Sequence, residues 1–159
     1  MRATHHRYTV DGWGVGELIV AGELVLAHDL PNPALGPDGA DDDTELSRRI
    51  AARVRDHLGG AETEYGDIEL DLSWCTDFQR ALGRALRDVP WGEIVSYGEL
   101  AALAGRPGAA RAAGTFCAQN RFALVMPCHR VVSSTGIGGY GASGVGLKRR
   151  LLALEGIEL

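Results

Sequence analysis

The first part of the chain alternates apolar and polar residues, which is the pattern of half-buried β-strands. The alternation covers about residues 7–30, around the stretch GVGELIVAGELVLAHDL, and glycines at positions 16 and 22 interrupt it. Residues 31–43, PNPALGPDGADDD, are rich in proline, glycine and aspartate and predict a mobile acidic loop. We therefore expect the strands of a small sheet, followed by a loop.

Two later segments carry apolar residues at helical spacing. Residues 44–60 place apolar side chains at every fourth position, from Leu46 to Leu58, between a candidate N-cap, Thr44, and a Gly-Gly stop. Residues 76–92, TDFQRALGRALRDVPWG, begin with a second N-cap signal and predict a helix that ends at Pro90. The stretch between them, YGDIELDLSW, predicts one more strand.

These elements predict an α/β protein with a sheet-containing N-terminal domain, residues 1–72, and a mainly helical C-terminal domain, residues 73–159. The overall charge is −5, but residues 1–77 carry 6 basic and 16 acidic side chains, whereas residues 78–159 carry 10 and 5. The two parts therefore differ in sign, and any contact with the phosphates of a nucleic acid is expected in the second part.

Residues 95–116, VSYGELAALAGRPGAARAAGTF, resemble a helix-turn-helix. The pattern predicts a first helix from Tyr97 to about Ala104, a turn at residues 105–107 and a second helix from about Gly108. The second helix surrounds one long cation, Arg111, with alanines and a glycine, and small residues let a backbone approach another surface closely. Two interpretations remain open at this point: packing against a neighbouring helix, or entry into a groove of nucleic acid.

A candidate nucleophile follows in FALVMPCHRVVSSTG, an apolar, strand-like run that ends at Cys128. A base or a cation makes a thiol reactive, and His129 and Arg130 are placed to help. Because adjacent residues rarely face each other in an extended chain, we expect His129 to act through a bridging water. The alternative is a core cysteine at the end of a strand.

The remaining composition excludes several classes of protein. The three cysteines, at positions 75, 117 and 128, form no CxxC pair, so neither a disulfide framework nor a structural zinc site is expected. No apolar run approaches the roughly 20 residues that span a bilayer, and the first residues lack the apolar middle of a signal peptide. We therefore expect a cytoplasmic protein without a membrane partner.

The segment PCHRV, residues 127–131, resembles the signature of the O6-alkylguanine-DNA alkyltransferases. The flanking stretches TDFQRALGRAL, VPWGEIVSYGELAALAGRPGAARAAG and GGYGASGVGLKRRLLALEG are similar to that family in order and spacing, so the resemblance covers about residues 76–156. It implies a small ribonuclease H-like N-terminal domain and a helical C-terminal domain with a helix-turn-helix.

The resemblance also implies a reaction. An alkyl group, such as methyl, would pass irreversibly from O6 of guanine in double-stranded DNA to the protein's own cysteine, with O4 of thymine as a second candidate position. One molecule would repair one lesion, as a monomer and without a cofactor or a metal. Cys128 would accept the alkyl group, His129 would be the water-mediated base, and Glu155 would orient the histidine.

Further positions match family residues that handle DNA and the flipped base. Arg111 would fill the gap left by the flipped nucleotide, and Tyr97 would help to rotate it. Asn120 would hold the turn between the second helix and the active-site strand. The remaining candidates would contact DNA along the second helix or wall the guanine pocket: Ala109, Ala110, Ala112 and Gly114 for DNA, and Pro127, Val131, Tyr140, Gly141 and Ala142 for the pocket.

The chain also departs from the family pattern. Arg121 stands where proline is common, Phe116 and Cys117 occupy positions that are usually small or polar, and Gly83 replaces a common tryptophan. The helix-turn-helix and the residues at 116 and 121 raise the alternative of a sensor that binds alkylated bases without repairing them, although such sensors lack the cysteine. A cysteine hydrolase or redox enzyme built on Cys128 and His129 is the third alternative.

Overall fold

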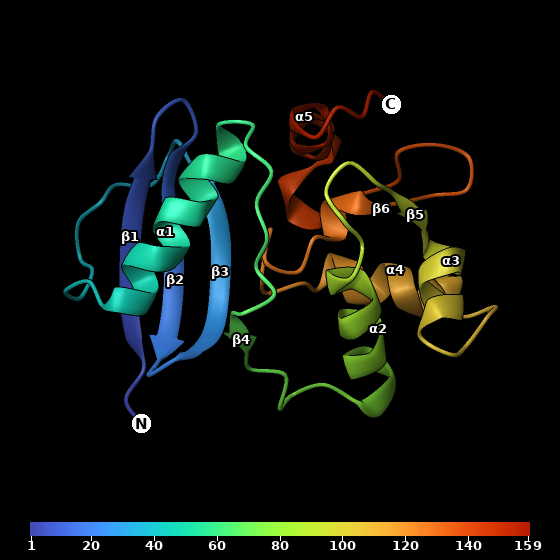
Figure 1. The fold of residues 1–159 in the computed structure, drawn as a ribbon, viewed down its shortest axis with the longest axis horizontal. Helices are drawn as coiled ribbons and strands as arrows, with labels where there is room; N and C mark the ends of the chain where they lie inside the picture. Colours follow the sequence, from blue (N-terminus) through green and yellow to red (C-terminus); the bar gives the residue numbers. More distant parts are fainter. The chain divides into compact units, whose positions relative to one another are not determined.

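Three antiparallel strands open the computed structural model, which describes all residues from 1 to 159. They are β1 (Thr4–Val10), β2 (Gly14–Ala21) and β3 (Leu24–Asn32), and the short β4 (Glu69–Leu70) pairs in parallel with β3, which gives the order β1-β2-β3-β4 (Figure 1). The alternation in the sequence has the expected effect, because Leu18 and Val20 are buried while Ile19 between them is 37% exposed.

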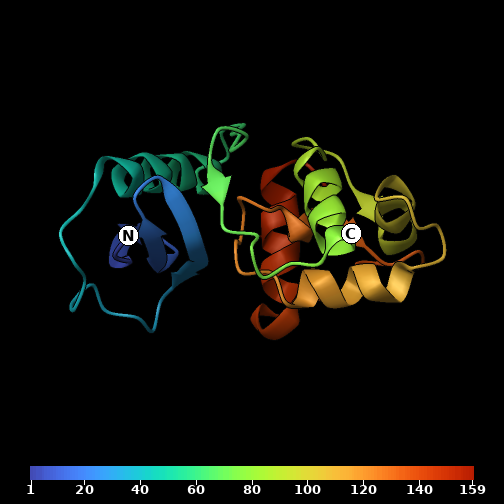
Figure 2. The ribbon, with the colours of Figure 1, turned by 90° about the horizontal axis from the view of Figure 1, so that it is seen from below.

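Helix α1 (Glu45–Leu58) covers one face of this sheet (Figures 1 and 2). It begins where the sequence predicted, since the Thr44 side chain accepts a hydrogen bond from the Ser47 backbone N–H and the Thr44 backbone N–H donates to the Ser47 hydroxyl. Its apolar side chains at every fourth position are all buried, and Gly59 caps its C-terminus. The burial of one helical stripe against the sheet forms the core of this part.

The chain divides into two units. The first contains Met1–Asp71 together with Arg121–Val125, and the second contains Leu72–Asn120 and Met126–Leu159. The sequence analysis placed residues 121–125 in the C-terminal domain. In the structure they lie beside β3, where His28 and Phe122 form an isolated parallel bridge.

Helices dominate the second unit. Thr76 caps α2 with a hydrogen bond from the Gln79 backbone, and Pro90 follows its end, as predicted. The helix-turn-helix is present as α3 and α4. The elements are α2 (Asp77–Arg87), β5 (Val95–Ser96), α3 (Tyr97–Leu103), α4 (Ala110–Ala118), the 3-10 turn η1 (Cys128–Arg130), β6 (Val131–Val132), the 3-10 turn η2 (Gly141–Ser143) and α5 (Val145–Leu154). None of these helices, nor α1, has the length and apolar content needed to cross a membrane.

The prediction of a strand before Cys128 is wrong. Phe122 and residues 124–126 are buried, but the only β-pairing here is an isolated bridge at Phe122, and Leu124 has a positive φ of 67°, which breaks an extended chain. Cys128 itself lies on η1, where its backbone N–H donates to the Met126 carbonyl at 2.8 Å. A short apolar run signals burial, and burial alone does not distinguish a strand from an irregular segment.

Candidate active site

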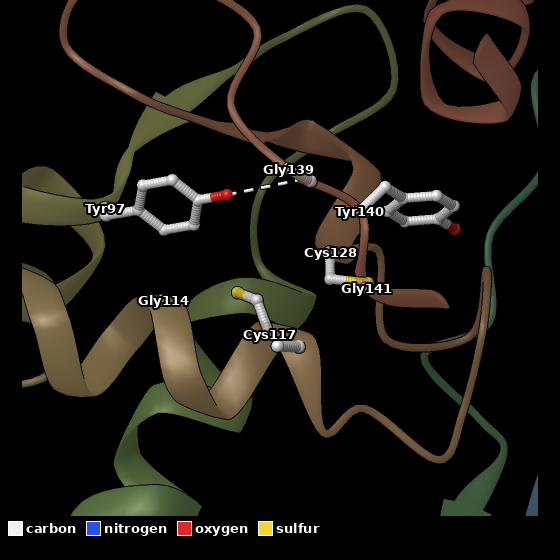
Figure 3. Close-up of a pocket in the computed structure, with 8 residues that line it drawn as sticks. Tyr97, Gly114, Cys117, Cys128, Gly139, Tyr140 and Gly141 are labelled. Atoms are coloured by element: carbon white, nitrogen blue, oxygen red, sulfur yellow. Dashed lines mark hydrogen bonds between the residues drawn. The ribbon is translucent and has the colours of Figure 1, made fainter. Parts of the chain in front are cut away.

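A pocket of about 100 Å³ in the second unit contains the sulfur-bearing side chains of Cys128 and Cys117 in its wall (Figure 3). Helix α4 supplies one side, and the glycine-rich loop before η2 supplies another. Tyr97, at the start of α3, points its hydroxyl at the Gly139 carbonyl, 3.5 Å away. The full lining is Tyr97, Gly114, Cys117, Ala118, Cys128, Gly139, Tyr140 and Gly141.

Asn120 holds the Cys128 sulfur. Its side-chain amide donates to Sγ at 3.0 Å and to the Met126 carbonyl at 2.9 Å, so the amide is fixed by the same turn that carries the cysteine. Cys128 is only 6% exposed, and its accessible side is the pocket. The thiol is therefore buried in the fold but available to a group that enters the pocket.

Burial raises the pKa of the Cys128 thiol, and three neighbours oppose this effect. In order of importance they are the hydrogen bond from Asn120, the charge of Lys148 and the hydrogen bond from Tyr140. The resting sulfur is thus a thiol at neutral pH, surrounded by groups that stabilise negative charge on it. Such a site keeps the sulfur protonated at rest and helps it to lose its proton when an electrophile arrives. A permanently ionised thiolate would be more prone to oxidation.

A second buried cluster lies beside Cys128. His129 Nε2 donates to Glu155 Oε2 at 2.7 Å, and the histidine is fully buried. Arg130 binds both oxygens of the same carboxylate, at 2.8 and 3.1 Å, and the Gly92 backbone N–H donates to Oε1 at 3.2 Å. Because a carboxylate at Nε2 requires the ring proton there, Nδ1 is the basic nitrogen of the neutral imidazole.

This cluster corrects one expectation and explains another. Arg130 was a candidate cation for the thiolate, but it faces Glu155 and the Val89 carbonyl, so its charge balances the buried glutamate. Glu155 lies 26 residues after His129 in sequence and meets it at the end of α5, as the sequence resemblance implied.

Lys148 is the site residue that the sequence analysis missed. It is fully buried, and its Nζ donates to the carbonyls of Val131 at 2.5 Å and Gly139 at 2.9 Å. Burial lowers its pKa, while the two pocket thiols act in the opposite direction. A signal was present, since Lys148 shares the buried stripe of α5 with Leu151 and Leu152. A lysine is rarely fully buried on an apolar stripe of a helix unless its ammonium group is paired with other groups.

Comparisons with known proteins show the family of the chain. The family model described as 6-O-methylguanine DNA methyltransferase, DNA binding domain, matches residues 77–157. A methylated-DNA–protein-cysteine methyltransferase of Mycolicibacterium paratuberculosis is 47% identical over 116 residues, which are 70% of this chain and 68% of that protein. The chain belongs to this family. The corresponding Mycobacterium bovis protein is 48% identical over 100 residues, 62% of this chain and 59% of its own length.

Solved structures of methyltransferases extend the match to nearly the whole chain. The Mycobacterium tuberculosis O6-methylguanine methyltransferase superposes with a TM-score of 0.80 at 33% identity, over 97% of this chain and 93% of that one. A structure of Mycobacterium tuberculosis OGT in complex with DNA gives the same TM-score at 34% identity, over 96% and 92% of the two chains. Both units therefore have the fold of the methyltransferases.

Helix α4 turns one face to the pocket. Gly114 and Ala118 line it, and Arg111 precedes Gly114 by three residues, so the exposed arginine continues the same stripe. On the other side of α4, Ala113 and Phe116 are buried. The remaining small residues predicted to contact DNA lie at the start of α4, with Ala112 exposed and Ala109 and Ala110 half-buried.

The departure of Phe116 from the methyltransferase pattern has a packing explanation. A Cβ at Gly83 would lie 3.7 Å from the Phe116 ring and 3.1 Å from the end of Met126, so these two side chains fill the space in front of the glycine. A larger residue at position 83 would therefore collide with Met126 and Phe116. Phe116 belongs to the core, and we find no basis for a role in contacting DNA.

The structure separates the predicted pocket residues into two groups. Tyr140 and Gly141 line the pocket. Asn120 does not line it but donates to the Cys128 sulfur. Pro127, Val131 and Ala142 do not line the pocket, although Val131 is buried and supplies a carbonyl to Lys148. Cys117, Ala118 and Lys148 replace them as neighbours of the reactive sulfur.

Proposed function

We propose that the protein is a methylated-DNA–protein-cysteine methyltransferase that takes the methyl group of O6-methylguanine in double-stranded DNA onto Cys128. The observation that carries this proposal is the position of the Cys128 sulfur, in the wall of an open pocket, next to the buried His129–Glu155 pair. A nucleophile, a base and a group that orients the base are thereby adjacent. Membership of the methyltransferase family supports the same reaction.

The chemistry follows from the geometry. The thiol proton passes through a bridging water to His129 Nδ1, while Glu155 stabilises the imidazolium at Nε2. The sulfur attacks the methyl carbon, a carbon–sulfur bond forms, the carbon–O6 bond breaks, and its electron pair leaves on the guanine, which is then protonated. The product is a thioether, which does not revert, so each molecule acts once. The methyl carbon is already activated by its attachment to O6, and the step requires no cofactor or metal.

Access to the lesion requires base flipping. A stacked guanine cannot bring O6 to a sulfur inside a protein pocket, and extrusion of the nucleotide costs on the order of a few kcal/mol. We propose that α4 enters the DNA with its small residues against the groove, that Arg111 takes the place of the flipped nucleotide, and that Tyr97 contacts it. The solved complex of Mycobacterium tuberculosis OGT with DNA supports DNA as the partner.

Three properties predicted from the sequence remain proposals. The three cysteines are free, and a reaction that consumes a reduced thiol suits a reducing compartment such as the cytoplasm. Action as a monomer is likewise part of the proposal. O4 of thymine remains a second candidate position for the alkyl group.

A single-turnover assay tests the proposal. The protein is mixed with a duplex that contains one O6-methylguanine, and its intact mass is measured together with peptide maps of the three cysteines. We expect one methyl group on Cys128, none after Cys128→Ser, and normal transfer after Cys75→Ala. Lesion binding without a mass gain would instead indicate a sensor of alkylated bases.

The second thiol of the pocket makes the assay more discriminating. Burial raises the pKa of Cys117 to about 12, with a further contribution from the neighbouring Cys128. Cys117 is therefore a thiol at neutral pH with no base beside it comparable to His129. Methylation of Cys117 in the Cys128→Ser protein would show that the pocket, rather than the His129–Glu155 pair, determines reactivity.

A further inference from the structure

The short segment Arg121–Val125 connects two parts of the active site. It follows Asn120, whose amide donates to the Cys128 sulfur, and precedes Met126, whose carbonyl accepts from the same amide. Its own contacts are nevertheless with β3, and it belongs to the first unit. The conformation of this segment therefore affects the turn that positions the sulfur.

One residue of β3, His28, makes three hydrogen bonds to this segment. The His28 backbone N–H donates to the Arg121 carbonyl at 2.8 Å, and the Ala123 N–H donates to the His28 carbonyl at 3.2 Å. The imidazole Nδ1 adds a third hydrogen bond, to the Ala123 carbonyl at 2.6 Å. Backbone and side chain of one residue thus hold both sides of the segment.

The environment of the ring fixes its protonation. Burial lowers the pKa of His28 to about 4, despite the opposing effect of the Ala123 carbonyl. The ring is therefore neutral at pH 7, with its proton on Nδ1, because a carbonyl can only accept. Nε2 is then an acceptor, and the buried Tyr8 hydroxyl donates to it. Tyr8 thereby selects the tautomer that binds Ala123.

The backbone of the segment shows why it needs such an anchor. Leu124 has a φ of 67°, a left-handed conformation that residues other than glycine adopt only where the surroundings enforce it. The hydrogen bonds of His28 to Arg121 and Ala123 supply that restraint just before Leu124.

We propose that His28 is a positioning residue for methyl transfer, which holds residues 121–125 so that the Asn120 amide stays directed at the Cys128 sulfur. The proposal rests on the proposed function for its catalytic consequence. The Asn120 amide stabilises negative charge on the Cys128 sulfur. The proposal is therefore tested directly by the ionisation of Cys128 and not by the stability of the fold.

The experiment compares two amide variants of His28. His28→Asn retains an N–H donor at the place of Nδ1, whereas His28→Gln carries its amide at the place of Nε2 and loses the donor to Ala123. The milder Tyr8→Phe change acts in the same direction as His28→Gln, because the ring can then carry its proton on Nε2. Val54→Ala, a cavity in α1 at a fully buried position, is the control for loss of stability alone.

The readout is the pH dependence of iodoacetamide reaction at Cys128, measured by peptide mass spectrometry on each folded protein, together with the single-turnover rate. We expect His28→Gln to raise the midpoint by about one pH unit and to slow transfer roughly tenfold, and Tyr8→Phe to shift both less. His28→Asn and Val54→Ala should keep the wild-type midpoint.

Unchanged midpoints in His28→Gln and Tyr8→Phe would overturn the proposal, as would an equal shift in Val54→Ala. If His28→Gln does not fold, Tyr8→Phe against Val54→Ala decides in the same way. Iodoacetamide needs no DNA, so a wild-type protein that transfers no methyl group would contradict the proposed function while the ionisation test of His28 remains valid.

Discussion

The carboxylate of Glu155 is the shared partner of the His129 ring and the Arg130 guanidinium. It accepts hydrogen bonds from His129 and from Arg130, and its side chain is fully buried. In a buried network, removal of one charged partner leaves the others uncompensated, which is more costly than loss of the pair as a whole. The carboxylate therefore balances the charge of Arg130, and in the proposed reaction it also orients His129.

A Glu155→Gln change removes the negative charge and keeps the packing, because the two side chains have nearly the same shape. We expect methyl transfer to slow by about 100-fold or more, since the imidazolium loses its counter-charge. We also expect a loss of roughly 3 kcal/mol in the free energy of unfolding from the unpaired Arg130. Single-turnover kinetics and urea unfolding measure the two effects.

The matched variant is Glu158→Gln, an exposed acid near the C-terminus. It should change neither quantity. A Glu155→Gln protein that transfers methyl at nearly the wild-type rate would show that His129 does not need a carboxylate.

The loop between β6 and η2 depends on glycine at a specific place. Gly138 has a φ of 73°, and a Cβ there would lie 3.0 Å from the Tyr97 hydroxyl and 3.1 Å from the Ser133 nitrogen. Both the backbone conformation and the space therefore exclude a side chain. Two residues earlier, Gly136 has an ordinary φ and nothing within 4 Å of such a Cβ.

This contrast gives a prediction for the loop as an element. Gly138→Ala should displace either the loop or Tyr97 and slow methyl transfer about tenfold or more, because the backbone strain of about 1–2 kcal/mol falls on the pocket wall. Gly136→Ala should transfer at the wild-type rate. Equal rates for both variants would mean that the pocket adjusts freely to its loop.

Helix α4 makes a different prediction, because its role is proposed to depend on duplex DNA. Arg111→Ala should slow transfer from a duplex by roughly tenfold or more, since nothing then fills the space of the flipped nucleotide. Transfer from the free base O6-benzylguanine, which needs no flipping, should be unchanged. The control is Arg149→Ala, an exposed arginine on α5.

Comparable losses on both substrates would contradict the role of Arg111 in flipping and would indicate a contact with the base itself. If the two arginine variants lose comparable transfer rates on duplex DNA, the effect of Arg111→Ala would be explained by general attraction between cations and phosphates.

At the scale of the whole molecule, His28 couples pH to stability. Its pKa falls from 6.5 in the unfolded chain to about 4 in the fold, so the unfolded chain binds the additional proton between these values. Stability is therefore complete above about pH 6.5 and decreases as the pH falls toward 4, by up to about 3 kcal/mol from this group.

Urea unfolding of the wild type and of His28→Asn between about pH 4.5 and 7.5 tests this coupling, since asparagine does not titrate and the other groups cancel in the difference. The wild type should lose more stability than the variant on acidification. Parallel curves would show that the histidine is protonated in the fold without penalty.

The sequence by itself determined the elements and the chemistry that depend on local patterns. Alternation produced the three long strands, Thr44 and Thr76 fixed the starts of two helices, and PCHRV identified the reactive cysteine. These signals are readable because capping, periodicity and short motifs involve residues that are close in the chain.

Tertiary structure decided what depends on residues far apart in sequence. It turned the expected strand before Cys128 into an irregular segment bound to His28, directed Arg130 to Glu155, and buried Lys148 beside the sulfur. It also placed the Phe116 ring in the space next to Gly83. A buried charge or a missing side chain acquires its meaning from the partner that packing brings to it, and no local pattern contains that partner.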